Sequence, residues 1–144
     1  MSRDLSALEE KLGYSFADRS LIETALTHSS YVKEQEHPGE YNERLEFLGD
    51  AFFDAVIGEE LYRKFPNEEE GFLSRVRATI VCERSLAEKA ARIGLGSHLL
   101  LGRGEEKTGG RQRPSVLADA MEALIGAVYL DGGFEAVQIG RAHV

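Results

Sequence analysis

The longest helical pattern in the chain covers residues 40–65, which read EYNERLEFLGDAFFDAVIGEELYRKF. At about 100° per residue, its apolar side chains point in several directions and form no single stripe. These side chains are Leu45, Leu48, Phe52, Phe53, Val56, Ile57 and Leu61. A helix that is apolar on most sides lies in the middle of a fold. The stretch therefore predicts a long central helix, and Pro66 should end it.

The rest of the chain also shows helical spacing, with little of the strict alternation that is typical of strands. We expect further helices over about residues 4–12, 19–31, 67–80, 82–93 and 115–130, and a loop over 102–114. The predicted helix starts are Asp4, a capping box of Asn67 with Glu70, and Ser115, and the predicted stops are Gly13, Gly94 and residues 131–133. The sequence thus predicts an all-α fold.

Length and composition limit the class of protein. A chain of 144 residues with 42% hydrophobic content fits one domain. No stretch approaches the roughly 18 uninterrupted apolar residues that a membrane span requires, and the charged N-terminus lacks the apolar core of a signal peptide. We therefore expect a cytoplasmic location. The lone Cys82 cannot form an intramolecular disulfide, and we interpret it as a small core residue.

The formal net charge of −8, taken alone, argues against a nucleic-acid partner, because phosphate binding depends on Lys and Arg. The distribution is uneven, however. Acids are concentrated in residues 34–70, whereas Arg103, Lys107, Arg111 and Arg113 lie close together in the Gly-rich stretch 102–114. This stretch is compatible with a local basic patch.

Three acids share one stripe of the predicted central helix. Glu43, Glu46 and Asp50 fall within an arc of about 60° when placed on a regular helix. Like charges at these spacings destabilise a helix by on the order of 0.2–0.5 kcal/mol per pair. The penalty grows where solvent is excluded, as we expect on a helix whose other faces are apolar.

A second pair of acids, Asp119 and Glu122, lies among apolar residues in the last predicted helix. Ser115, Asp119, Glu122 and Gly126 form one strip on that helix, and its small outer members allow another helix backbone to come close. Buried carboxylates must be protonated, paired or bound to a metal.

Two explanations account for these five acids. Arg44 is placed to pair with one of them but not with all. A hard divalent cation would satisfy the group, since Mg²⁺ prefers a few carboxylate oxygens and waters. Alternatively, the acids are solvated or are paired with Arg75, Arg77 or Lys side chains of neighbouring helices.

Four motifs stand in a recognisable order. They are LTHSSY at residues 26–31, NERLEFLGD at 42–50, EGFLSRVRA at 70–78 and LADAMEALIG at 117–126. The second motif resembles the signature of the ribonuclease III family, and the others resemble the motifs that surround it there. The resemblance covers about residues 5–138 and implies the homodimeric, all-helical endonuclease domain of the bacterial type.

The resemblance implies roles for individual residues. Glu46, Asp50, Asp119 and Glu122 match the family's metal-binding carboxylates, and of these Asp50 and Glu122 are expected to be catalytic. The spacing of the acids had already singled out the same four. His28, a lone histidine near a helix end, is interpreted as structural rather than as a general base.

Four further residues match outlying positions of the family. Glu43 and Glu70 match acids at the ends of the cleavage groove, which contact RNA or organise the dimer. Lys107 matches a lysine near the scissile phosphate, and Phe47 matches an aromatic residue that enters a pocket of the partner subunit. The alternatives are a solvated helix start for Glu43, the capping box for Glu70, a solvated loop lysine for Lys107 and core packing for Phe47.

The family implies cleavage of double-stranded RNA that depends on Mg²⁺, for which Mn²⁺ can substitute, and that leaves 5′-phosphate and 3′-hydroxyl ends during ribosomal and messenger RNA processing. Recognition would rest on A-form shape. The glycines of 102–114 fit no nucleotide-binding fingerprint, so we expect no nucleotide cofactor. Two alternatives are a short relative for ribosomal RNA maturation and a non-catalytic relative that binds double-stranded RNA; such a relative would lack metal-binding acids.

The C-terminal end is expected to be incomplete. Family members usually continue into a double-stranded-RNA-binding domain, which is absent here, and the endonuclease domain at residues 1–138 is expected to have a truncated final helix. The last six residues, IGRAHV at 139–144, match the translation of a common sequencing-adapter DNA. We expect them to be a non-native tail.

Overall fold

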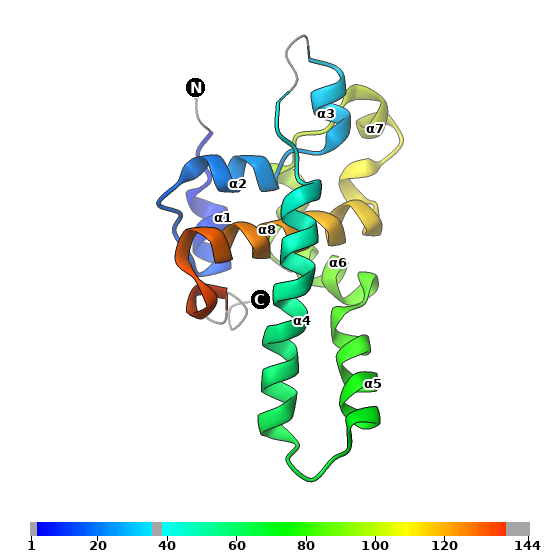
Figure 1. Cartoon of the computed structure of the whole chain (residues 1–144). Coiled ribbons are helices and arrows are strands. Elements are labelled where there is room, and N and C mark those ends of the chain that lie inside the picture. Colours follow the sequence, from blue (N-terminus) through cyan, green and yellow to red (C-terminus); the bar gives the residue numbers. More distant parts are fainter. Residues whose placement is uncertain (1–2, 36–38, 138–144) are drawn as a thin grey trace.

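The computed structural model describes residues 3–35 and 39–137, and helices make up most of these residues (Figure 1). Its elements are α1 (Ser6–Leu12), α2 (Arg19–Ala25), α3 (Ser29–Lys33), α4 (Glu43–Lys64), α5 (Glu70–Val81), α6 (Glu83–Arg92), η1 (Leu95–His98), α7 (Arg103–Lys107), η2 (Gly110–Gln112) and α8 (Pro114–Gly132). Within the described ranges no strand is present, and β pairing is limited to an isolated bridge between Thr27 and Leu100. The predicted all-α fold is confirmed.

Helix α8 forms the centre of the core. Ten of its residues are buried, including Ala123, Leu124 and Ala127, which have no exposed surface. It packs against α4, α6 and α2, and α4 crosses it in Figure 1. At its end, Asp131 accepts hydrogen bonds from the Tyr14 hydroxyl at 2.6 Å and from the backbone amides of Ala17 and Asp18 at 2.8 Å each. The end of α8 is thereby joined to the turn between α1 and α2.

Helix α4 has two different parts. Its first part crosses α8 and buries Leu45, Gly49 and Phe53. Its last part and α5 run beside each other as a hairpin that projects from the body of the domain (Figure 1). Helix α5 has no fully buried residue. The predicted central position is therefore confirmed for the first part of α4. The whole helix begins at Glu43 and ends at Lys64.

The predicted single helix over residues 19–31 is wrong, because the chain turns at Leu26, Thr27 and His28. There the backbone pairs with a distant segment: the His28 amide donates to Leu100 at 3.0 Å, and the Leu100 amide donates to Leu26 at 2.9 Å. The Asn42 amide also donates to Thr27, at 2.9 Å. These pairings replace helical hydrogen bonds and separate α2 from α3.

The predicted loop over 102–114 is also wrong in part, because it contains α7 and η2. Two acids of α7 pair with arginines that follow it: Glu105 with Arg113, and Glu106 with Arg111. These ion pairs fold the Gly-rich stretch back on itself. A short helix that is stabilised by such tertiary contacts has little sequence signal of its own.

Several predicted helix starts are shifted. Helix α8 begins at Pro114 and not with a Ser115 cap, since proline suits the first position of a helix. Helix α5 begins at Glu70 without a capping box, and the Glu70 carboxylate accepts a hydrogen bond from Ser74 Oγ at 3.1 Å. At α1, Asp4 accepts from the Ser6 amide at 3.0 Å, but Leu5 occupies the capping position.

The predicted stops fit better. Gly13 and Gly94 have φ values of 80° and 67°, a conformation that L side chains rarely adopt.

The prediction that Cys82 is a core residue is wrong. Cys82 is exposed, because it occupies the extended break between α5 and α6. None of the helices in residues 3–35 and 39–137 is long and apolar enough to cross a membrane. The predicted non-native tail, residues 139–144, lies outside the described residues.

Candidate metal centre

The site is built where α4 and α8 cross, and two glycines allow their backbones to touch. A Cβ atom on Gly49 would overlap the carbonyl oxygen of Glu122, and one on Gly126 would overlap the carbonyl oxygen of Leu45. The close approach predicted for the strip that contains Gly126 is confirmed. It brings the acids of α4 directly against those of α8.

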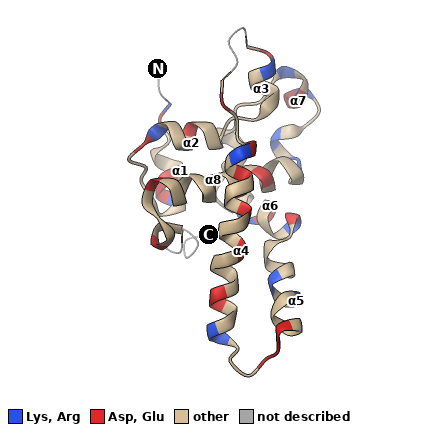
Figure 2. Cartoon of the chain, viewed as in Figure 1, with Lys and Arg blue, Asp and Glu red and all other residues tan. Residues whose placement is uncertain are grey.

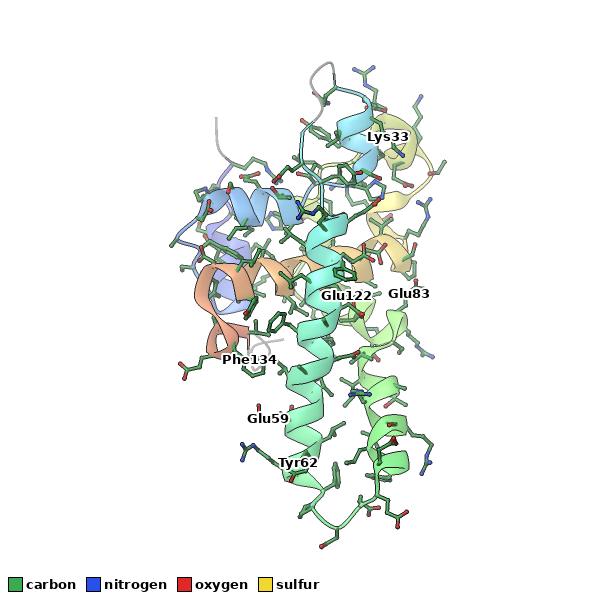
Figure 3. The ribbon with its side chains drawn as sticks, viewed as in Figure 1. Lys33, Glu59, Tyr62, Glu83, Glu122 and Phe134 are labelled. Atoms are coloured by element: carbon green, nitrogen blue, oxygen red, sulfur yellow. The ribbon has the colours of Figure 1, made fainter. Side chains whose placement is uncertain are left out.

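Four carboxyl groups meet at this crossing. Glu46, Asp119 and Glu122 each offer an oxygen atom, and these atoms all lie within 4.8 Å of one another. The carboxyl of Glu46 hydrogen-bonds that of Asp119, and the carboxyl of Glu122 hydrogen-bonds that of Asp50. Figure 3 shows Glu122 at the crossing. Three of the acids are half-buried and Asp50 is exposed.

These acids form the floor of an open cleft of about 670 Å³. The cleft is lined by His28, Ser29, Asn42, Glu43, Glu46, Phe47, Asp50, Asp119 and Glu122. Its walls thus come from α4, α8 and the start of α3. Five of the lining residues are acidic, so the cleft attracts cations.

The acids perturb one another strongly. Burial, followed by the neighbouring Asp119 carboxyl, raises the pKa of Glu46 to about 7. Burial and the hydrogen bond with Asp50 raise the pKa of Glu122 to about 9. Burial also raises the pKa of Asp119. Without a cation, the folded site therefore favours protonated carboxyls.

No Lys or Arg of the described ranges forms an ion pair with any of these acids. The alternative in which Arg75 or Arg77 neutralises them is thus not realised in that part of the chain. Figure 2 shows acidic segments of α4 and α8 together at the crossing. An all-oxygen set of acids that lacks basic partners is suited to a hard divalent cation.

The predicted basic patch is only half available, which corrects the sequence interpretation. Arg111 donates to Glu106 and to the carbonyls of Gly96 and Leu99. Arg113 is paired with Glu105. Arg103 and Lys107, at the two ends of α7, are exposed and have no ion pair within the described residues.

The remaining predicted site residues are dispersed. Glu43 and Phe47 line the cleft at the start of α4, and 81% of the Phe47 surface is exposed. Lys107 ends α7 and Glu70 begins α5 at the far end of the hairpin, and neither lines the cleft. A single copy of the chain therefore brings together the four predicted metal ligands, Glu43 and Phe47.

Beside the cleft lies an apolar groove of about 900 Å³, which shares Glu43 and Phe47 with it. The large apolar residues of this groove are Leu21, Tyr41, Leu45, Phe47, Leu48 and Leu130. Phe47 stands at the border between a polar and an apolar depression. Its alternative interpretation as plain core packing does not fit its exposure.

Sequence reasoning missed three lining residues, His28, Ser29 and Asn42. Asn42 is buried, and its Nδ2 donates to the Ala25 carbonyl at 3.2 Å. His28 does have the structural role that was inferred, because its side chain caps α3. Its place on the cleft wall depends on the break between α2 and α3, which no local pattern indicates.

Known proteins resemble this chain in sequence and in fold. A family model described as Ribonuclease-III-like matches residues 18–140. The chain belongs to the ribonuclease III family. It is 57% identical to Ribonuclease 3 of Caldanaerobacter subterraneus subsp. tengcongensis over 134 residues. These aligned residues make up 93% of this chain and 59% of the relative. For Ribonuclease 3 of Oleidesulfovibrio alaskensis, the identity is 52% over 137 residues, or 95% and 60% of the two chains.

Solved structures of the ribonuclease III family share the fold. The nuclease domain of ribonuclease III from Campylobacter jejuni superimposes with a TM-score of 0.90 at 45% identity, over 97% of this chain and 95% of that domain. That domain is described as flexible in a region involved in dimer formation. Dicer from Pichia stipitis gives a TM-score of 0.63 at 28% identity, over 88% and 52% of the two chains. The present chain spans about three-fifths of the curated relatives.

Proposed function

We propose that this chain acts as the nuclease domain of a metal-dependent endoribonuclease that cuts double-stranded RNA. The observation that carries the proposal is the meeting of Glu46, Asp50, Asp119 and Glu122 at one helix crossing, without basic partners in the described chain. The family supplies the reaction class. A non-catalytic relative is the weaker candidate, because this chain retains all four acids.

We assign Mg²⁺ to the cluster, with Mn²⁺ as a substitute. The carboxylate oxygens within 4.8 Å of one another fit such an ion, which binds a few carboxylates and keeps several waters. Glu46, Asp50, Asp119 and Glu122 would hold it. When bound, a divalent cation activates water and stabilises charge on phosphorus and on the leaving 3′-oxygen, which gives 5′-phosphate and 3′-hydroxyl ends.

Asp50 and Glu122 form the catalytic pair in this proposal. Asp50 is exposed and Glu122 is half-buried, and their carboxyls are joined by a hydrogen bond. The pair therefore connects the floor of the cleft with solvent, and in this proposal it would accept the proton that the attacking water loses. Glu46 and Asp119 are half-buried like Glu122, and the hydrogen bond between their carboxyls joins α4 to α8.

The chain is proposed to act as a homodimer in which Phe47 of each copy enters the apolar groove of the other. A two-fold axis requires such a self-complementary surface, and Phe47 lies on the border of the groove that it would fill. Two clefts would then face the two RNA strands and produce staggered ends. Glu70 and Lys107 lie outside the cleft of their own chain, so their proposed RNA contacts need long RNA or the partner copy.

The test of the activity is cleavage of double-stranded against single-stranded RNA with Mg²⁺, Ca²⁺ or a chelator. We expect Mg²⁺-dependent cleavage of the duplex, and we expect Glu122→Gln to reduce kcat by at least about 100-fold. Glu106→Gln is the matched control, because Glu106 is an exposed acid of α7 outside the cleft. Cleavage that persists in chelator would contradict the metal assignment.

Ribosomal and messenger RNA precursors remain the proposed substrates, and the cytoplasmic location stays a prediction.

The test of the dimer is the molar mass in solution. Phe47→Glu places a charge where an apolar contact is proposed, so it should shift the chain to monomer in sedimentation equilibrium. Tyr62→Glu is the matched control, since Tyr62 is also largely exposed, at 72%, but does not line the groove. If Phe47→Glu leaves the mass unchanged, the proposed interface is wrong.

A further inference from the structure

The imidazole of His28 is held in one orientation on the cleft wall. The Ser30 backbone amide donates to Nδ1 at 3.1 Å, and Ser30 Oγ lies 2.8 Å from the same nitrogen. A backbone amide can only donate, so Nδ1 is the acceptor and carries no hydrogen. The ring hydrogen is therefore on Nε2. The side chain is mostly buried, with 23% of its surface exposed.

The Nε2 hydrogen has no close acceptor within the described chain. The nearest acid, Glu105, has Oε1 at 3.8 Å, which is too far for a hydrogen bond. Glu105 is in addition already paired with Arg113. Because His28 lines the cleft, its Nε2 hydrogen can be donated to a molecule that enters.

Ser29 is a second donor on the same wall. It is half-buried and lines the cleft, and its hydroxyl makes no hydrogen bond with any residue in the described ranges. The third uncharged polar residue of the lining, Asn42, already donates its Nδ2 to the Ala25 carbonyl. His28 and Ser29 thus offer free side-chain donors in a cleft whose lining, apart from them, Asn42 and Phe47, consists of acids.

An RNA strand needs such donors here. Once a cation holds the acids in their ionised form, the carboxylates and the non-bridging oxygens of a phosphate are all acceptors, so the acidic floor offers the phosphates of the RNA no direct hydrogen bond. Phosphate contacts fix the register of a nucleic acid on a protein. We propose that His28 Nε2 and Ser29 Oγ donate to one backbone phosphate and so set the register of the RNA strand in the cleft. This inference rests on the proposed cleavage of RNA at this site.

Two isosteric variants separate this role from the capping of α3. In His28→Asn, the amide oxygen takes the place of Nδ1 and retains the cap, but no group reaches the position of Nε2. In His28→Gln, the longer amide reaches that position and the cap is lost. We expect the melting temperature of His28→Asn to be close to that of the wild type. Its affinity for duplex RNA should be about 3- to 10-fold weaker, a factor that corresponds to the loss of one neutral hydrogen bond. His28→Gln should be less stable and should bind nearly as well as the wild type.

The binding assay uses the whole chain with Glu122→Gln in every sample, so that a perfectly paired RNA duplex is not cut in Mg²⁺. Ser29→Ala should weaken binding by a similar factor. The slope of log K against log salt should not change with any of these variants, because neutral donors release no counterions. In cleavage by the chain with Glu122 intact, His28→Asn should raise KM more than it lowers kcat.

The outcomes distinguish this inference from the proposed function. If the wild-type chain binds and cuts duplex RNA while His28→Asn binds it equally well, the inference is wrong and the function stands. The inference is also wrong if His28→Gln loses as much affinity as His28→Asn, since the histidine would then act only through the cap. If the wild-type chain neither binds nor cuts the duplex, the inference is overturned together with the proposed function.

Discussion

Two groups of acids in this domain have opposite environments. In α7, Glu105 and Glu106 face Arg113 and Arg111, and hydrogen bonds from these guanidinium groups lower the pKa of both carboxyls. At the α4–α8 crossing, acids face acids, and burial together with neighbouring carboxyls raises the pKa of Glu46 and Glu122. Acidic side chains are therefore neutralised by arginines in one region, whereas in the other they have no ion pair with any Lys or Arg of residues 3–35 and 39–137.

The lack of ion pairs at the crossing, within the described residues, does not result from a shortage of basic residues nearby. Arg111 and Arg113 lie just before α8, the helix that carries Asp119 and Glu122, yet their side chains turn to α7. Clustered acids destabilise a fold unless something else binds them. The arrangement is consistent with a site that is kept free for a cation.

The largest expected effect comes from separating the two helices that form the cluster. Gly49→Ala places a methyl group into the Glu122 carbonyl, so we expect a loss of about 3 kcal/mol in the free energy of unfolding. Urea denaturation measures it. Gly104→Ala in α7 is the control, because nothing lies within 4 Å of a Cβ at that position. This control should be neutral or stabilising by about 0.5 kcal/mol. Equal losses in both variants would contradict the close contact of the backbones.

The second prediction concerns the cation. Mg²⁺ at about 100 times its dissociation constant should stabilise the wild-type domain by about 2.7 kcal/mol, because it binds the folded cluster alone. Glu122→Gln should lose most of this gain, and Glu106→Gln should keep all of it. Thermal melts over a Mg²⁺ titration measure the effect. If the two variants respond alike, the contrast between the two groups of acids has no consequence for metal binding.

The third prediction is the sign of the pH dependence without metal. Glu46 and Glu122 have pKa values near 7 and 9 in the folded chain, above the ordinary 4.5. Their protonated forms stabilise the fold fully below pH 4.5, and this contribution is lost as pH rises toward 9. Between pH 5 and 9, Glu122→Gln should gain about 1–2 kcal/mol over the wild type, after allowance for solvent screening.

The acids of α7 should show the opposite sign. Their lowered pKa values mean that their contribution is present above the pKa of the unfolded chain and is lost as pH falls through the folded value. The free energy of unfolding of Glu106→Gln should therefore differ only slightly from that of the wild type. Glu106→Gln should not gain stability over the wild type as the pH rises. Denaturation curves at several pH values check both signs. A gap between Glu122→Gln and the wild type that shrinks with rising pH would refute the assignment.

The smallest effect is expected in the paired region. Arg111→Gln removes hydrogen bonds to the carbonyls of Gly96 and Leu99, at 2.6 and 2.9 Å, and the ion pair with Glu106. We expect a loss of about 1 kcal/mol in the free energy of unfolding and no change in Mg²⁺ affinity. Calorimetric titration checks the affinity. A weaker affinity for Mg²⁺ would mean that Arg111 and the acids at the α4–α8 crossing interact electrostatically.

The sequence predicted the part of the site that depends on helical periodicity. Glu46 and Asp50 had to share a face of α4, and Gly126 had to leave room beside Glu122, because both follow from regular spacing along one helix. The all-α fold followed from the same periodicity. The three-dimensional structure was needed to show which helices cross. It was also needed to show that Gly49 of α4 lies against the backbone of α8 at Glu122.

The parts that could not be predicted do not follow from the regular spacing of residues along one helix. The break at Thr27 results from backbone pairing with Leu100, and it places His28 on the cleft wall. Helix α7 depends on Arg111 and Arg113, which follow it in the chain. Cys82 was assigned to the core because of its residue type, and it is exposed at a break between two helices. Local propensity gives way to contacts outside the helix itself at Thr27 and in α7.

The hydrogen bonds of Asp131 have a consequence for the order in which the newly made protein can fold. The turn between α1 and α2 obtains its acceptor from the last turn of α8, and α2 and α4 pack against that same helix. Translation delivers these early helices long before α8. On the ribosome, the apolar faces of α2 and α4 stay uncovered until α8 has been made, so the core of the domain can form only after α8 has emerged.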